Sequence, residues 1–122
     1  MAVSHKTMED TLTKFGCRTI HSIKKVTEYM LPKLKEPIYL HKENNEPQIV
    51  IRPVFNAFRE ELETVSGANI KSDSYHNADM TRFPKRIHTG KKEVHYGIAV
   101  TFENSMAIEN FLSKLSKIAA GS

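Results

Sequence analysis

The stretch that most constrains this chain is residues 93–102, in which large apolar side chains alternate with small or polar ones. Side chains along a β-strand point alternately to opposite faces, so a period of two predicts a strand with one face on a core. The core face is made by Val94, Tyr96, Ile98, Val100 and Phe102. A glycine inside a strand commonly marks the close approach of another backbone. We therefore expect the second face to be covered at Gly97 and Ala99 and open at Glu93 and His95.

An amphipathic helix is predicted directly after this strand. Its apolar residues recur at intervals of three or four and form a single stripe, made by Ile108, Phe111, Leu112, Leu115 and Ile118. Asn104 or Ser105 supplies an N-cap side chain, which accepts a hydrogen bond from a free N–H group of the first turn. The strand and the helix together predict a sheet with a helix packed on it.

A basic segment, residues 81–92, precedes the same strand. It contains no acidic residue and five positive charges, which are Arg82, Lys85, Arg86, Lys91 and Lys92. Pro84 cannot donate a hydrogen bond to a neighbouring strand, which favours an edge strand or an extended loop at this point. Residues 89–92 provide a turn, so we expect the basic segment and the 93–102 strand to form a hairpin.

Two helices are predicted in the N-terminal part of the chain. In residues 7–15 the apolar side chains share one helical face, and Gly16 can end the helix. A second helical spacing of apolar residues runs through residues 20–34. Pro32 should kink or end this second helix, because proline lacks the backbone N–H group and clashes with the preceding turn.

A hairpin and a third helix are predicted next. Residues 38–41 and 48–52 are rich in β-branched and aromatic side chains, which favour strands. Pro53 suits the first turn of a helix. The apolar face of that helix is made by Phe55, Phe58, Leu62 and Val65, and its solvent-exposed face by Glu60, Glu61 and Glu63. The polar residues 68–80 favour a loop with a short strand around Ile70.

The order of these elements predicts one α+β domain over residues 1–122. Residues 1–36 would form a helical N-terminal part, and residues 37–122 a sheet with two helices. The sheet should be mainly antiparallel, because it is built from two hairpins with helices packed on it. The length of 122 residues, with 39% hydrophobic and 26% charged residues, is typical of a soluble globular domain.

The sequence also predicts a cytoplasmic protein without a membrane partner. No apolar run approaches the ~18 residues of a membrane span, and the N-terminal residues lack the apolar centre of a signal peptide. Cys17 is the single cysteine, so an internal disulfide is excluded. We expect Cys17 to be buried or incidental, although the neighbouring Arg18 could lower the pKa of its thiol.

The main candidate for a binding surface is residues 75–95. The net charge is +4, and its excess lies in the basic segment. Lys and Arg supply most of the affinity for nucleic-acid backbones, while Phe83, Tyr96 or His88 could stack on bases. The predicted binding residues are Tyr75, His76, Arg82, Phe83, Lys85, Arg86, His88, Lys91, Lys92 and His95. In the alternative interpretation, the lysines and the proline only protect an edge strand from pairing with other chains.

Three histidines in the same region raise a second hypothesis, a small metal-free ribonuclease. His76, His88 and His95 could act as general acid and base, with Arg86 or Lys85 stabilising the charge on phosphorus. The chain has no HxxxH, HExxH or CxxC spacing, so we expect neither a metal site nor a cofactor. The turn at residues 89–92 contains Gly-Lys, but the remainder of a phosphate-binding P-loop pattern is absent.

The preferred prediction is a non-catalytic binding protein whose partner is anionic, either nucleic acid or an acidic face of another protein. The metal-free ribonuclease is the first alternative. A second alternative is an immunity or antitoxin type of protein that neutralises a toxin by direct binding. The polar residues 72–79 present Tyr75 and His76 beside the basic hairpin, and Tyr and Arg are common at the centre of protein interfaces.

Overall fold

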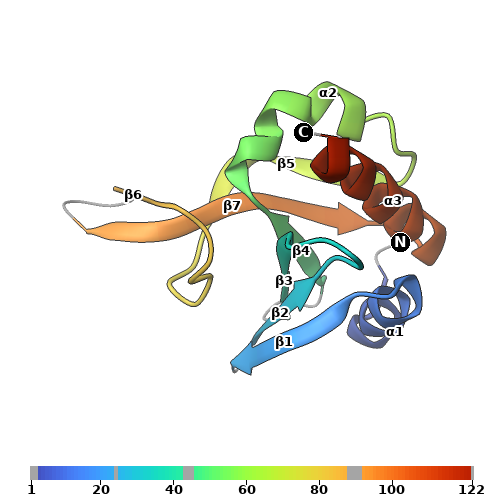
Figure 1. Cartoon of the computed structure of the whole chain (residues 1–122), viewed down its shortest axis with the longest axis horizontal. Coiled ribbons are helices and arrows are strands. Elements are labelled where there is room, and N and C mark those ends of the chain that lie inside the picture. Colours follow the sequence, from blue (N-terminus) through green and yellow to red (C-terminus); the bar gives the residue numbers. More distant parts are fainter. Residues whose placement is uncertain (1–2, 24, 43–45, 88–91, 122) are drawn as a thin grey trace.

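A seven-stranded sheet and three α-helices form the part of the chain that the structure describes (Figure 1). The structure is a computed structural model, and it describes residues 3–23, 25–42, 46–87 and 92–121. The elements in chain order are α1 (His5–Phe15), β1 (Arg18–Ile23), β2 (Val26–Met30), β3 (Pro37–His41), β4 (Gln48–Ile51), a 3-10 helix η1 (Pro53–Phe58), α2 (Arg59–Leu62), β5 (Ala68–His76), β6 (Lys85–Ile87), β7 (Glu93–Phe102) and α3 (Ser105–Gly121). The predicted α+β class with a mainly antiparallel sheet is confirmed.

The long strand β7 joins the parts of the sheet. The strand order is β1-β2-β3-β4-β7-β5, and β6 pairs with the outer end of β7. Every pairing is antiparallel. Ile98 and Val100 pair with β4, whereas Glu93 and His95 pair with β6. One end of β7 therefore lies inside the sheet, and the other end extends beyond it with only a short partner strand.

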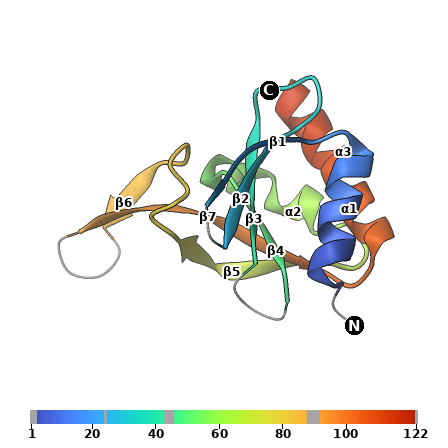
Figure 2. The same ribbon diagram turned by 90° about the horizontal axis from the view of Figure 1, so that it is seen from below.

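The helices cover one face of the sheet (Figure 2). α1 and α3 pack against each other, and the main core lies between them and the sheet. Ser4 caps α1 by accepting a hydrogen bond from the Thr7 N–H group, and Gly16 ends it with a φ of 105°. Asn104 caps α3, because its Oδ1 accepts a hydrogen bond of 2.8 Å from the Ala107 N–H group. The expected N-cap and the helix after the 93–102 strand are thus confirmed.

A second, smaller core covers the opposite face of β7. Its buried members are Val26, Tyr39, Val50, Met80, Phe83 and Ala99. Gly97 is required there, because a β-carbon at this position would lie 2.6 Å from the carbonyl oxygen of Ile51 and 2.8 Å from a ring carbon of Phe83. The expected cover over Gly97 and Ala99 is therefore present, while Glu93 is exposed and His95 half-buried.

The prediction of a second N-terminal helix over residues 20–34 is wrong, because residues 18–30 form the hairpin of β1 and β2. All five residues of β2 are buried, so this strand lacks the alternation that identifies a half-buried strand. The apolar residues of 20–34 happen to be spaced three or four apart, as they are in an amphipathic helix. The β-branched side chains of this segment, including Thr19, Val26 and Thr27, nevertheless favour strands.

Two further expectations need adjustment. The segment after Pro53 begins as a 3-10 helix and contains only four α-helical residues, Arg59–Leu62, although Gly67 follows it with the expected left-handed φ of 85°. Residues 68–76, expected as a loop with a short strand, form the whole of β5. The predicted hairpin of β3 and β4 is present, and Glu60, Glu61 and Glu63 are exposed as expected. Among the described helices, none is both long and apolar enough to cross a membrane.

Candidate functional site

The outer end of β7 and its partner β6 project from the body of the molecule (Figures 1 and 2). We call this region the arm and define it as Lys85–Ile87 together with residues 92–96. All three residues of β6 are exposed, and Lys85, Arg86 and Ile87 pair with His95, Val94 and Glu93, respectively. The predicted pairing of the basic segment with the 93–102 strand is therefore present, whereas residues 89–91 of the expected turn lie outside the described residues.

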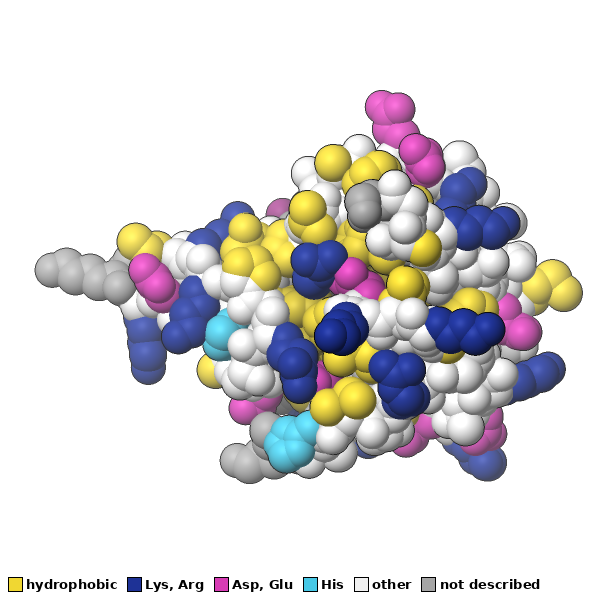
Figure 3. Space-filling view, in the orientation of Figure 1, with side chains coloured by type: hydrophobic (Ala, Val, Ile, Leu, Met, Phe, Trp, Pro, Cys, Tyr) yellow, Lys and Arg dark blue, Asp and Glu magenta, His cyan; other side chains and the backbone are white. Residues whose placement is uncertain are grey.

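Three positive side chains lie on the described part of the arm. Lys85, Arg86 and Lys92 are exposed, and Figure 3 shows Lys and Arg side chains on the projecting end as well as across the face in view. Glu93 is the acidic residue among them. His88 and Lys91 belong to the predicted binding set but lie outside the described residues. The arm thus carries an excess of positive charge.

Arg86, Tyr96 and His76 form a cluster on the side of the arm that faces η1. The Arg86 guanidinium carbon lies 4.7 Å from the centre of the Tyr96 ring, a cation–π contact. Arg86 Nε donates a hydrogen bond of 3.1 Å to His76 Nε2. The His76 ring stacks on Tyr96, with ring centres 6.1 Å apart. The three flat groups therefore orient one another, and Arg86 is held close to the aromatic ring.

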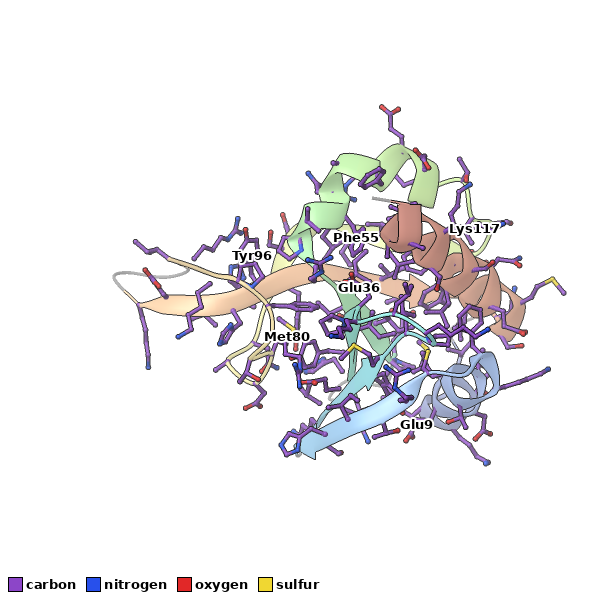
Figure 4. All side chains as sticks on the ribbon, in the orientation of Figure 1. Glu9, Glu36, Phe55, Met80, Tyr96 and Lys117 are labelled. Atoms are coloured by element: carbon purple, nitrogen blue, oxygen red, sulfur yellow. The ribbon has the colours of Figure 1, made fainter. Side chains whose placement is uncertain are left out.

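His95 lies on the opposite face of the arm from this cluster. His76 pairs with Tyr96 across the sheet, and His95, one residue earlier on β7, points the other way. Its Nδ1 lies 2.6 Å from the carbonyl oxygen of Phe83, so Nδ1–H donates to that carbonyl. Figure 4 illustrates the same division, with Tyr96 and Met80 on opposite sides of β7. His76 and His95 therefore do not converge on one reaction site.

Phe83 and Tyr75 have packing contacts on the face that carries His95. Phe83 is only 3% exposed, and its ring meets Tyr39 edge-on with the centres 4.8 Å apart. Phe83 consequently has no free ring face for a base, contrary to one of the stacking roles suggested for it. Tyr75 is half-buried against the second core, and the centre of its ring lies 4.9 Å from the centre of the His41 ring.

Arg82 is bound to the body of the protein rather than to the arm. Its Nε donates a hydrogen bond of 2.5 Å to Oε2 of the buried Glu28. The hydroxyl of Tyr39 donates to the other oxygen of Glu28 and accepts the backbone N–H group of Arg82, both at 3.0 Å. Burial raises the pKa of Tyr39, so this hydroxyl remains a donor. Glu28 offsets the charge of Arg82, and the pair ties the segment before β6 to β2.

A second buried carboxylate has the same kind of partner. Glu36 accepts two hydrogen bonds from Arg52, each of 2.6 Å, and Arg52 also lies over the Phe55 ring. These hydrogen bonds raise the pKa of Arg52. This pair closes the loop between β2 and β3 onto the end of β4, and it contributes to the fold rather than to the arm.

A cleft of about 290 Å³ lies beside the cluster, between η1 and the outer part of β5 and β7. Its lining residues are Pro53, Asn56, Arg59, Ser72, Asp73, Ser74, Arg86, Tyr96 and Ile98. Arg59 is fixed on one wall, since its guanidinium donates hydrogen bonds to Asn56 Oδ1 and to the carbonyl oxygen of Lys71. Glu63 lies 3.9 Å from the same guanidinium and offsets part of its charge.

The sequence indicated only one side of this cleft. Tyr96 and Arg86 lie in the region singled out from charge and aromatic content, and Ser72 and Ser74 lie in the polar stretch named as a candidate protein interface. Arg59 and Asn56 were missed. They come from a helical segment with no local motif, and only the folding of η1 against β5 and β7 brings them close.

The described residues offer little support for metal or thiol chemistry. Within them, no three His, Cys, Asp or Glu side chains are close enough together to hold a metal ion. Cys17 is buried, and burial raises the pKa of its thiol to about 11, although Arg18 acts in the opposite direction. The thiolate is the reactive form of cysteine, so Cys17 is an inert thiol at neutral pH.

Comparison with models of protein families, with curated proteins and with solved structures found no match to this chain.

Proposed function

We propose that this protein is a non-catalytic binding protein that uses the arm to engage an anionic macromolecule, either nucleic acid or an acidic face of another protein. The observation that carries the proposal is the position of Lys85, Arg86 and Lys92. All three are exposed on a structure that projects from the body. Unlike Arg82, which has Glu28, they have no carboxylate within ion-pair distance among the described residues.

A purely structural role explains only part of the positive charge on the arm. Edge strands are commonly protected from pairing with other chains by lysine and proline, and Lys85 and Pro84 agree with such a role. That role does not require an arginine fixed against a tyrosine beside a cleft. Fixing Arg86 against Tyr96 and His76 limits its conformations before a partner arrives, which lowers the entropy lost on binding.

The ribonuclease hypothesis has weaker support. General acid–base catalysis needs two groups within reach of the same reacting atoms, and His76 and His95 are on opposite faces of the arm. The remaining pairs include His88, which lies outside the described residues. A toxin-neutralising protein is one form of the acidic-protein alternative, and we place either binding activity in the cytoplasm, in keeping with a single buried thiol.

The proposal is tested by the salt dependence of binding. A fluorescent oligonucleotide and a fluorescent polyglutamate peptide serve as defined anionic probes, and fluorescence anisotropy gives each Kd over a series of salt concentrations. Release of counterions from the probe makes affinity for a nucleic acid fall steeply with salt, and screening weakens charge pairing with an acidic peptide. We expect at least one probe to bind with an affinity that falls as salt is raised.

Two results would contradict the proposal. One is the absence of binding to both probes at low salt, and the other is a Kd that does not change with salt. Cleavage of the oligonucleotide during the measurement would instead favour the ribonuclease alternative. His95→Ala and His76→Ala variants would then be compared for turnover and binding.

A further inference from the structure

We propose that the cleft between the arm and η1 is a subsite for one unpaired nucleotide, so that the protein binds single-stranded nucleic acid in preference to a duplex. This inference rests on the proposed function and narrows it to one class of partner. It uses the 290 Å³ cleft and the Arg86–Tyr96–His76 cluster that forms one of its walls.

The charges in the cleft fit a nucleotide better than a simple anion. Arg86 and Arg59 provide positive charge on two sides, but Asp73 also lines the cleft. A carboxylate repels phosphate, whereas it accepts hydrogen bonds from the amino and imino groups of a base. The two arginines therefore suit the phosphate backbone, and Asp73 with the Asn56 side chain suits the edge of a base.

The remaining walls suit the flat face of a base. Tyr96 is half-buried and lines the cleft together with Pro53, Ile98 and Arg86, whose guanidinium lies over the Tyr96 ring. Stacking on an aromatic ring or on an arginine plane is the usual way in which proteins hold unpaired bases. Arg86 already lies against Tyr96, and within the described chain only its Nε is hydrogen bonded. The terminal nitrogens of its guanidinium are available to a phosphate group.

The size of the cleft selects against a duplex. Ligand clefts commonly range from ~300 to ~1,000 Å³, so a volume near 290 Å³ takes one base with little room for more. A base inside a double helix is stacked on its neighbours and must be turned out of the helix to enter such a cleft, which costs free energy. An unpaired base does not carry this cost. The exposed Lys92 then lies on the arm within reach of the adjoining backbone, whereas Lys85 pairs with His95 and shares its face of the arm.

The test compares single-stranded and double-stranded probes of the same sequence and about 12 nucleotides in length, within the ~4–16 nucleotides that small single-strand-binding folds cover. Fluorescence anisotropy gives the Kd of each probe for the wild type and for three variants, Tyr96→Leu, Tyr96→Phe and Phe15→Leu. Phe15→Leu is the matched control, because Phe15 is also half-buried but lies on α1, away from the arm. Circular dichroism checks that each variant is folded.

We expect the single strand to bind at least about 10-fold more tightly than the duplex. Tyr96→Leu should weaken single-strand binding roughly 10-fold, the loss expected when one base loses its aromatic partner, and change duplex binding much less. Tyr96→Phe keeps the ring and should bind like the wild type, as should Phe15→Leu.

Equal affinity for the two probes, or equal effects of Tyr96→Leu and Phe15→Leu, would overturn the inference. If the duplex or the polyglutamate peptide still bound in a salt-dependent manner, the proposed function would stand without this subsite. If no probe bound at all, both would fail, so the two outcomes are distinguishable.

Discussion

The two ends of β7 have opposite surroundings although they belong to one continuous strand. At the inner end, residues 97–102 are buried between the helix-covered core and the second core. At the outer end, Glu93 is exposed, Val94, His95 and Tyr96 are half-buried, and β6 pairs alongside. The inner end is part of both cores, and we propose that the outer end determines binding. Changes at the two ends should therefore have separate effects.

The two arginines that flank Pro84 show the same difference. Arg82 donates to the buried Glu28 and is part of the inner structure. Arg86, four residues later, lies over Tyr96 on the arm. The local sequence does not distinguish Arg82 from Arg86, because both belong to the same basic segment. The difference comes from Glu28 and Tyr96, which the fold brings close to one arginine each.

The largest effect should come from Gly97→Val at the inner end. A β-carbon at this position would lie 2.6 Å from the Ile51 carbonyl oxygen, a backbone atom that cannot move aside without disturbing β4. We expect a loss of about 3 kcal/mol or more in the free energy of unfolding, the upper part of the range for overpacked cores, measured by urea denaturation.

Two control variants accompany this measurement. Gly121→Ala adds a methyl group where no atom lies within 4 Å, and Ile87→Ser changes a side chain on the arm that is 62% exposed. Both should alter the free energy of unfolding by less than about 0.5 kcal/mol. A Gly97→Val protein as stable as the wild type would break the distinction between the two ends.

The next largest effect should come from Arg82→Leu. It leaves the Glu28 carboxylate buried with the Tyr39 hydroxyl as its remaining described partner. Uncompensated buried charges cost several kcal/mol, and partial exposure of Arg82 lowers the figure here, so we expect a loss of about 2 kcal/mol. Denaturation of the single variant and of the Glu28→Gln/Arg82→Leu double variant provides the measurement.

The double variant separates charge from packing. Because Gln is neutral and still accepts from Tyr39, it should recover much of the stability that Arg82→Leu loses. Lys85→Leu removes a positive charge from the arm and should leave stability unchanged. If Lys85→Leu were as destabilising as Arg82→Leu, the basic segment would be structural throughout.

A smaller effect on stability should come from Cys17, which is buried in the body of the protein and is distant in sequence from the arm. Burial raises the pKa of its thiol from 9.0 to about 11. The folded state therefore favours the protonated thiol. The resulting stabilisation is complete below pH 9 and disappears as the pH rises through 11. The free energy of unfolding of the wild type should fall more steeply over this interval than that of Cys17→Ala.

Other groups that titrate in this pH range are shared by both proteins, so only the difference in slope reports on the thiol. Parallel pH profiles for the wild type and Cys17→Ala would contradict the assignment. Rapid modification of Cys17 in the folded protein by a thiol reagent at neutral pH would contradict it as well.

The sequence predicted those parts of the fold in which a local pattern and the tertiary environment agree. β7 alternates because one face of its inner end meets the main core, and α3 has an apolar stripe for the same reason. The need for Gly97 was also visible, since a glycine in a strand indicates close approach. β2 was missed because it is buried on both faces, so its apolar residues carry no alternation.

The candidate site was only partly predictable for a similar reason. The excess of positive charge at 81–92 is a local feature and indicated the arm. The local sequence does not show which of those side chains are free to bind. Glu28, which is distant in sequence, pairs with Arg82, and Phe83 is buried in the second core. Arg59 reaches the cleft only after η1 has folded against β5 and β7, which no spacing in the sequence reveals.

The most direct test of the central claim is the salt concentration needed to elute two charge-matched variants from a heparin column. Lys85→Gln/Lys92→Gln removes two charges from the arm, and Lys35→Gln/Lys117→Gln removes two exposed charges from the body. Both variants have the same net charge, so a difference between them reports on position alone. Our account predicts markedly earlier elution for the arm variant and nearly wild-type elution for the body variant. Equal elution of the two variants would contradict it.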